Sequence, residues 1–208
     1  MTMTATVAAL LLFGSDGAND FEPLFNGKDL SGWTGAKDSY EVVDGAIVCK
    51  PKKGGVLFTE KDFEDFILIF EFKLPTGGNN GIALRYPGKG RASGEGMGEI
   101  QLLDDDDPKY AKLDSRQYTG SLYGIAAAKR GALKKLGEWN QMQIEAVGPH
   151  LKITLNGKLI LDTDVSKIDK FYNDYPHPGK DRKSGRIGLC GHNDQVAVRK
   201  IEIKQIKN

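Results

Sequence analysis

The 208-residue chain has little of what most metal, redox and nucleotide sites require. It contains three histidines and two cysteines, Cys49 and Cys190, whose spacing excludes a CxxC zinc or redox motif. Both cysteines stand in apolar runs, so we interpret them as small buried hydrophobes, with a single disulfide as the alternative. GxSxG, P-loop and HExxH motifs are also missing, and no GxGxxG follows a strand. The corresponding hydrolase, protease and nucleotide chemistries therefore lack support.

The chain also lacks a charge excess of either sign. Lys and Arg number 29 against 28 Asp and Glu, which gives a net charge of +1, and no basic run is longer than two residues. Nucleic acids and anionic membranes attract strongly basic surfaces. This near-neutral balance therefore argues against both kinds of partner, and it leaves the oligomeric state open.

One apolar run stands near the N-terminus. Residues 5–13 are apolar or small, which is too short to span a bilayer and suits the hydrophobic region of a signal peptide. The preceding "MTMT" carries no Lys or Arg, although such a region normally does. We expect residues 1–19 to form an export segment, with a disordered leader as the alternative. Residues 20–208 then form one domain that is periplasmic or secreted.

From residue 21 onward the signals are mostly those of β-strands. Asp44-Gly45 and Asn156-Gly157 each stand between apolar runs, which predicts two-residue hairpin turns. Residues 66–72 are apolar on both alternating faces, as in a central strand of a sandwich. The alternation slips near Arg199 and Lys200, which we interpret as a bulge. Helix signals are scarce, so the sequence predicts an all-β sandwich or jelly roll of antiparallel sheets.

A charged residue stands in an otherwise apolar stretch at residues 81–86. A period of two places Arg85 on the face opposite Ile82, Leu84 and Tyr86. The preceding "GGNNG" is rich in small residues and Asn, which allow a ligand to approach the backbone closely. We therefore expect Arg85 to project onto a polar face of the sheet.

Residues 98–103 repeat this pattern. Ile100 and Leu102 share one face, while Glu99 and Gln101 share the other. If the two strands pair or lie close in one sheet, Arg85 and Glu99 project onto the same face. The alternative is an ordinary solvated face of an antiparallel sheet, where such residues have no chemical role.

His192 follows directly on a late strand. Its imidazole can exchange protons near neutral pH, so it becomes a candidate if the fold brings it to the face of Glu99. A purely structural role is the alternative. His150 looks like a turn residue, and His177 lies between two prolines in a loop.

Four consecutive carboxylates occupy residues 104–107. We interpret this run as a solvated loop, with calcium binding as the alternative because hard oxygen ligands in loops suit that ion. The run lacks EF-hand spacing. The sequence otherwise predicts no cofactor and no metal site.

The ordered segments "FEPLFNGKDLSGW", "YEVVDGAIV", "GGNNGIALR", "GEIQLLDD", "TGSLYGIAAA" and "GRIGLCGH" resemble the bacterial 3-keto-disaccharide hydrolase family. The resemblance runs from about residue 21 to residue 204. It implies a concanavalin A-like jelly roll of two antiparallel sheets with a concave polar face, and an exported protein. Two positions depart from the family pattern, since Asn80 replaces a common Ser and Cys190 replaces a common Gln.

The resemblance also implies a reaction, the hydrolysis of a glycoside whose sugar carries a ketone at C3. A base would remove the C2 proton, the group at C1 would leave from the enolate, and water would add back. The matching positions give Glu99 or His192 the role of base. Arg85 would stabilise the oxyanion, and Gln101 would orient the sugar.

Further substrate contacts are assigned to Asn80, Tyr123 and Trp139, the last of which could instead belong to the core. Two other functions compete with this one. The first is a non-catalytic carbohydrate-binding module. The second is a retaining glucanase, which needs two carboxyls about 5–5.5 Å apart and finds Gln101 where one of its acids would stand.

Overall fold

The computed structural model describes residues 20–207, so the predicted export segment lies outside the described residues and stays a prediction. The strands fall into two antiparallel sheets. The large sheet contains β1 (Glu22–Pro23), β3 (Tyr40–Val43), β4 (Ala46–Cys49), β6 (Phe66–Lys73), β9 (Trp139–Val147), β10 (His150–Leu155), β11 (Lys158–Asp164) and β13 (Ala197–Gln205). The small sheet contains β2 (Trp33–Gly35), β5 (Gly54–Thr59), β7 (Asn79–Tyr86), β8 (Gly98–Leu103) and β12 (Arg186–His192).

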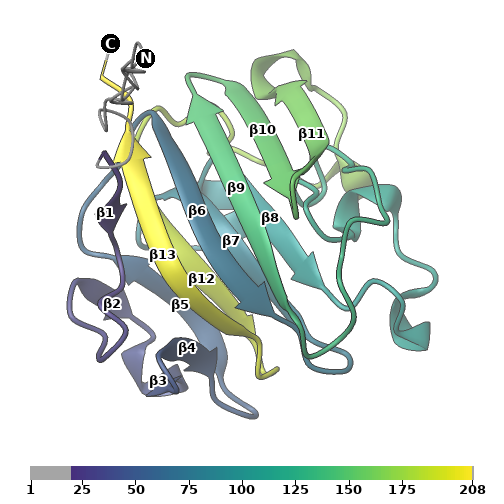
Figure 1. Ribbon diagram of the computed structural model, residues 1–208. Helices are drawn as coiled ribbons and strands as arrows, with labels where there is room; N and C mark the ends of the chain where they lie inside the picture. Colours follow the sequence, from purple (N-terminus) through teal and green to yellow (C-terminus); the bar gives the residue numbers. More distant parts are fainter. Residues whose placement is uncertain (1–19, 208) are drawn as a thin grey trace, which may run out of the picture.

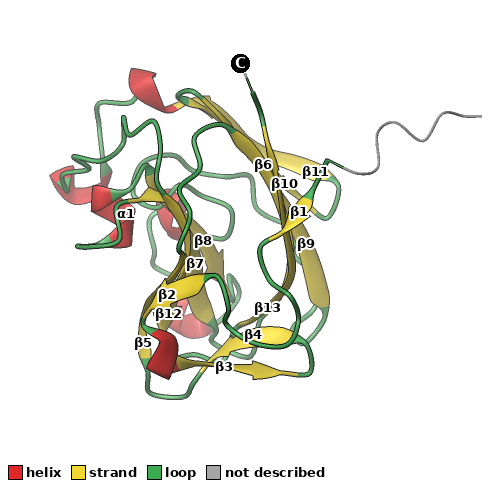
Figure 2. Ribbon diagram, turned by 90° about the vertical axis from the view of Figure 1, so that its left-hand side faces the viewer, coloured by secondary structure: helices red, strands yellow, loops and turns green. Residues whose placement is uncertain are grey.

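The two sheets pack face to face, as the edge-on view in Figure 2 shows. Strand order is β11-β10-β9-β6-β13-β4-β3 in the large sheet, with β1 on β13, and β2-β5-β12-β7-β8 in the small sheet (Figure 1). The predicted fold class, an antiparallel two-sheet sandwich of jelly-roll type, is confirmed. Because β12 lies between β5 and β7, segments far apart in sequence become neighbours in the small sheet.

Within residues 20–207, helical structure is confined to short turns, as expected. They are α1 (Ala92–Glu95) and the 3₁₀ turns η1 (Lys37–Ser39), η2 (Pro108–Tyr110), η3 (Ser115–Gln117), η4 (Val165–Lys167) and η5 (Tyr172–Asp174). Among the described residues, no helix has the length and apolar character needed to cross a membrane. In Figure 2, α1 lies on the side of the small sheet that faces away from the large sheet.

The predicted hairpins are confirmed. Asp44 and Gly45 have φ of 50° and 73° between β3 and β4, and Asn156 and Gly157 have 50° and 80° between β10 and β11. Two successive positive φ angles match the right-handed twist of the flanking strands, which is why Asp-Gly and Asn-Gly are preferred there. These local turns set the register next to each turn, and the β10–β11 pairing then shifts by one residue between Ile153 and Thr154.

The core lies between the sheets. The central strand β6 packs between β9 and β13, and its residues Phe66, Leu68, Phe70 and Phe72 are at most 1% exposed. They meet an inner row of the small sheet that includes Leu57, Ile82, Leu84, Ile100 and Leu189. Both cysteines are buried and free, as the apolar context predicted.

Three strands carry an extra residue, namely β7, β11 and β13. In β13 the pairing with β6 shifts between Arg199 and Glu202, and Lys200 has φ of 49°, which confirms the predicted bulge. In β7 the pairing with β12 shifts between Ala83 and Tyr86, and Arg85 has φ of 48°. A bulge of this kind places two residues opposite one and changes which face later side chains occupy. Simple alternation therefore fails in β7 after Leu84.

Candidate functional site

The outer face of the small sheet, turned away from the core, carries the candidate site. Register places Glu99 opposite Ala83 and Gln101 opposite Gly81, while Ile100 and Leu102 face the core. A second apolar cluster occupies this outer face, separate from the main core. Its members are Ala83, Tyr86, Ala92 and Cys190, with Val56 and Phe58 packed against them. Glu99 and Gln101 therefore lie beside a partly apolar floor.

Glu99 and His192 come together across the sheet. Glu99 belongs to β8, His192 ends β12, and β7 lies between these strands. Glu99 Oε1 nevertheless lies 3.8 Å from His192 Nε2. The close approach depends on Gly81 of β7, because a Cβ at that position would overlap the Glu99 carboxylate. The strand that separates the pair thus leaves space for it.

The carboxylate of Glu99 is desolvated and incompletely hydrogen-bonded. Its side chain is 9% exposed, and Oε1 is buried without a hydrogen-bond partner among the described residues. The side chain of His192 is 52% exposed. Buried acceptors without partners are rare in folded proteins and are often reserved for chemistry. Glu99 Oε1 is therefore available to a proton brought by a ligand.

Glu99 raises the pKa values of two neighbouring side chains. Contact with the Glu99 side chain raises the pKa of His192, against the opposing effect of burial. Burial raises the pKa of the Cys190 thiol well above its ordinary value, and the negative charge of Glu99 raises it further. The site therefore favours an imidazolium at His192 and a neutral thiol at Cys190.

Gln101 and the neighbouring asparagines are arranged differently from the prediction. Gln101 Nε2 donates to Asn79 Oδ1 at 2.7 Å, so these two amides share the outer face. Asn80 pairs with Leu102, is 1% exposed, and accepts a hydrogen bond from the N–H of Gly81. The predicted substrate contact by Asn80 is therefore wrong in its geometry. Alternation from Ala83 back to Asn79 would have identified the correct asparagine.

Arg85 does not project beside Glu99, and that prediction is wrong. Its guanidinium, 2% exposed, pairs with Asp65 Oδ1 at 3.0 Å. It also donates to the carbonyl oxygens of Glu64, Gly148 and Arg182 at 2.7–3.0 Å. The bulge turns Arg85 inward and leaves Tyr86 in the outer cluster. Arg85 thus links the small sheet to the segments at one end of the large sheet.

Trp139 is also misplaced by the prediction. It begins β9 in the large sheet, where the guanidinium of Arg199 lies 3.9 Å and the ammonium of Lys73 lies 4.9 Å from its ring centroid. Along β9, Met142 faces the core while Trp139 and Gln141 face outward. Trp139 therefore lies on the outer face of the opposite sheet from Glu99.

Tyr123 does lie next to Glu99. Its backbone N–H donates to the carbonyl oxygen of Glu99 at 2.8 Å, and its hydroxyl accepts a hydrogen bond from Gln117 Nε2. It lines a cavity of about 140 Å³. The other lining residues are Arg91, Ser93, Gly124, Tyr172, Asn173, Tyr175 and His177.

Sequence reasoning missed Arg91 and dismissed His177, which both line this cavity. Burial lowers the pKa of Arg91, while the nearby charges of Glu95, Glu99 and Tyr123 act in the opposite direction. The guanidinium thus lies within electrostatic reach of both Glu99 and the cavity. Nothing in the Gly-rich stretch around Arg91 marks it in the sequence.

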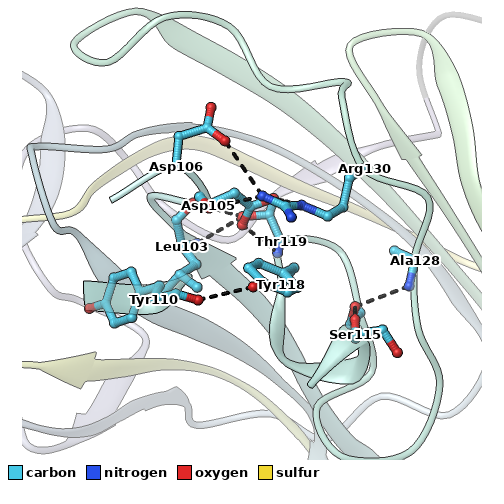
Figure 3. Close-up of polar contacts among 10 residues, drawn as sticks. Leu103, Asp105, Asp106, Tyr110, Ser115, Tyr118, Thr119, Ala128 and Arg130 are labelled. Carbon is cyan, nitrogen blue, oxygen red and sulfur yellow. Dashed lines mark hydrogen bonds and ion pairs between the residues drawn. The ribbon is translucent and has the colours of Figure 1, made fainter. Parts of the chain in front are cut away.

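The side chains of the acidic run, residues 104–107, make hydrogen bonds and ion pairs with other residues of the protein. Asp104 accepts from the N–H of Gly77, and Asp107 accepts from the N–H of Lys109. Asp105 accepts from the N–H of Thr119, and both Asp105 and Asp106 lie near the guanidinium of Arg130 (Figure 3). Within residues 20–207, no cluster of three or more His, Cys, Asp or Glu is placed to hold a metal ion. The calcium alternative gains no support from this arrangement.

Comparisons with known proteins agree with this architecture. The chain is 28% identical to the 3-keto-disaccharide hydrolase of Bacteroides thetaiotaomicron, over 90% of this chain and 79% of that protein. The crystal structure of a candidate glycosyl hydrolase from Parabacteroides distasonis superposes with a TM-score of 0.80 at 28% identity, over 90% of this chain and all of that one.

A carbohydrate-binding module from Bacillus subtilis, CBM66, shares the fold with a TM-score of 0.55 at 14% identity, over 84% of this chain and 96% of that one. The family model described as a 3-keto-alpha-glucoside-1,2-lyase-like domain matches residues 20–204. That match spans nearly all of the chain, which therefore belongs to the 3-keto-alpha-glucoside-1,2-lyase-like family.

Proposed function

We propose that this protein cleaves glycosides whose sugar ring carries a ketone at C3, and that Glu99 and His192 perform the proton transfers. The observation that carries the proposal is the buried, unpartnered Oε1 of Glu99 beside the imidazole of His192. The name of the Bacteroides relative, a 3-keto-disaccharide hydrolase, supports the substrate class.

In this proposal Glu99 is the base. The C3 carbonyl acidifies the neighbouring C2–H bond, and Glu99 takes that proton as the enolate forms. The enolate then collapses, so that the C1–O bond breaks, a C1=C2 double bond forms and the C3 ketone is restored. Water adds back, with its oxygen at C1 and a proton at C2, and the net reaction is hydrolysis. A general base of this kind typically accelerates proton transfer by 10²–10⁴-fold.

His192 supplies the proton that the leaving oxygen at C1 needs. The raised pKa of its imidazole keeps it protonated at higher pH than an ordinary histidine, so it can act as the acid. Its half-exposed ring suits contact with both substrate and water. Gln101, held by Asn79, is placed on the same face to orient a sugar hydroxyl.

The competing functions receive less support. Among the residues of β8 only Glu99 is acidic, since position 101 is an amide and position 103 a buried Leu, so the strand lacks the paired carboxylates of a retaining glucanase. A non-catalytic binding module finds support in the tyrosines of the cavity beside Glu99. Measured turnover distinguishes a binding module from the enzyme.

The test uses 3-keto glucose–glucose disaccharides with α and β links, incubated in D₂O. We expect turnover, with deuterium at C2 of the released 3-keto sugar. The Glu99→Gln variant should lose about 10²–10⁴-fold in kcat. The matched control Glu41→Gln changes an exposed glutamate of β3 and should keep full activity.

Three outcomes would contradict the proposal. Binding of these sugars without turnover would favour the binding module. Turnover that leaves hydrogen at C2 would indicate direct displacement at C1. Unaltered activity of Glu99→Gln would remove Glu99 as the base.

A further inference from the structure

We infer that the cavity beside Tyr123 is a second sugar subsite, in which His177 Nε2 and Arg91 bind hydroxyl groups of the ring that does not carry the ketone. This inference rests on the proposed function for the identity of the substrate. Its structural basis is a cavity-lining residue, His177, whose buried Nε2 has no hydrogen-bond partner among the described residues.

One ring nitrogen of His177 is hydrogen-bonded, and the other has no partner within residues 20–207. The residue is 6% exposed, and its Nδ1 lies 2.7 Å from the carbonyl oxygen of Ser93. A carbonyl only accepts hydrogen bonds, so Nδ1 carries the proton and Nε2 presents a lone pair. Nε2 is buried without a hydrogen-bond partner among the described residues. It faces Gly124, where a Cβ would lie 3.3 Å from it.

The surroundings keep this ring in place and neutral. The Phe171 ring packs edge-on against it, with centroids 4.9 Å apart, and Tyr175 lies 6.3 Å away. Burial lowers the pKa of His177, and the positive charge of Arg91 lowers it further. The Nε2 atom is thus a fixed acceptor that calls for a donor from outside the protein.

Arg91 provides the complementary donor. Its guanidinium stacks 3.3 Å from the centroid of the Tyr175 ring and donates to the carbonyl oxygen of Pro176 at 3.3 Å. This leaves further N–H groups of the guanidinium for a ligand, since arginine has five. A group that meets both His177 Nε2 and Arg91 must donate and accept. A hydroxyl does both, whereas a carboxylate cannot donate, so a sugar hydroxyl fits this pair of residues.

The size and position of the cavity fit one part of a substrate. Its volume of about 140 Å³ is below the roughly 300–1,000 Å³ of a complete small-molecule site. Tyr123 lines the cavity, and its backbone N–H donates to the backbone carbonyl oxygen of Glu99, so the cavity adjoins the strand that carries Glu99. Tyr172 and Tyr175 add aromatic surface on which the apolar face of a sugar can pack.

The experiment compares two substrates that share the reacting ring. The first is the 3-keto disaccharide and the second is the methyl 3-keto-glucoside of the same anomer, which has no second ring. The His177→Phe variant keeps the ring contact with Phe171 and removes the acceptor. We expect kcat/KM to fall roughly three- to tenfold for the disaccharide, as for the loss of one hydrogen bond, and to stay unchanged for the methyl glycoside.

Two further variants guard against a folding artefact. Tyr175→Ala changes a side chain that is 47% exposed, so it should fold normally and show the same substrate-dependent loss. His150→Phe is the matched control, because His150 is an exposed residue at the start of β10 that pairs with Asp162, and it should leave both substrates unaffected. Equal losses for both substrates in His177→Phe and Tyr175→Ala, or no loss for either, would overturn the subsite.

A binding measurement separates this inference from the proposed function. The ring ¹⁵N resonance of His177 Nε2 should shift when the unoxidised parent disaccharide is added, and should not shift with methyl glucoside. If the wild-type protein turned over no 3-keto sugar, the proposed function would fail, yet a selective shift would still support the subsite. A missing shift with the disaccharide would overturn the subsite whatever the turnover.

Discussion

His192 and His177 show how one residue type acquires opposite properties in two places. Contact with Glu99 raises the pKa of His192, whereas burial lowers the pKa of His177. Between 6.5 and the raised value, folded His192 holds a proton that the unfolded chain has lost, so its contribution to stability falls as the pH rises through that window. Between the lowered value and 6.5, His177 is neutral only when folded, so its contribution falls as the pH decreases.

A pH titration followed by NMR tests the pair at the site. We expect His192 to titrate above the ordinary 6.5 in the wild-type protein and to move downward in Glu99→Gln, because the neutral amide no longer stabilises the imidazolium. His177 serves as an internal reference. A titration of His192 that does not respond to Glu99→Gln would show that the two side chains do not interact.

At this scale the sequence identified some site residues and missed others for a physical reason. Glu99 stands at a strand position where alternation predicts its face, whereas the sequence placed His192 just past a strand, and the structure makes it the last residue of β12. His177 stands in a loop, and its burial against Phe171 and Ser93 arises from tertiary packing. Arg91 depends on a cation–π contact with Tyr175, which no local pattern predicts.

The element that shapes the site is β7. Gly81 leaves room for the Glu99 carboxylate, since a Cβ there would overlap it. Farther along, the bulge at Arg85 reverses the alternation and leaves Tyr86 in the outer cluster. A strict period of two predicts the first half of this strand correctly and the second half incorrectly, because an extra residue leaves no mark in apolar composition.

Gly81→Ala is the substitution that tests this strand. The atom in the way is the far end of a flexible glutamate, so the fold should survive and the carboxylate should move away from His192. We expect an activity loss that approaches that of Glu99→Gln, with a melting temperature close to that of the wild-type protein. Wild-type activity in Gly81→Ala would show that the carboxylate need not lie over β7.

At the scale of the whole molecule, the site uses one of two outward faces. Glu99, His192 and the cavity lie on the small-sheet side, while Trp139 lies outside the large sheet. The turns Asp44-Gly45 and Asn156-Gly157 and the pattern of β6 predicted the sandwich, because those signals are local. Which faces meet across the sheets depends on strand order, and β12 enters the small sheet from the far end of the chain.

The buried ion pair of Arg85 with Asp65 links the small sheet to the start of β6 in the large sheet and should therefore stabilise the fold. Removing one partner of a buried ion pair typically costs about 3–5 kcal/mol, because the other charge stays buried. We expect Arg85→Met to lower the free energy of unfolding by about that amount in urea titrations. The folded fraction should keep a kcat near that of the wild-type protein.

Arg182→Met is the control, because Arg182 contributes its backbone carbonyl to Arg85 while its own side chain is exposed. It should change stability by less than about 0.5 kcal/mol. Normal stability of Arg85→Met together with lost turnover would instead indicate that Arg85 takes part in the reaction.

The bulge in β7 also makes the length of this strand as important as its composition. Deleting Arg85 would remove the extra residue and restore strict alternation with Tyr86 still on the outer face, so the outer cluster would keep its ring while the buried ion pair with Asp65 would be lost. Most substitutions along β7 change a single contact, whereas a one-residue gap or insertion in the regular part of the strand, from Asn79 to Ala83, would move the side chains on one side of it to the opposite face. Sequence alignments of relatives should therefore first match the number of residues in this strand and then compare the residue types.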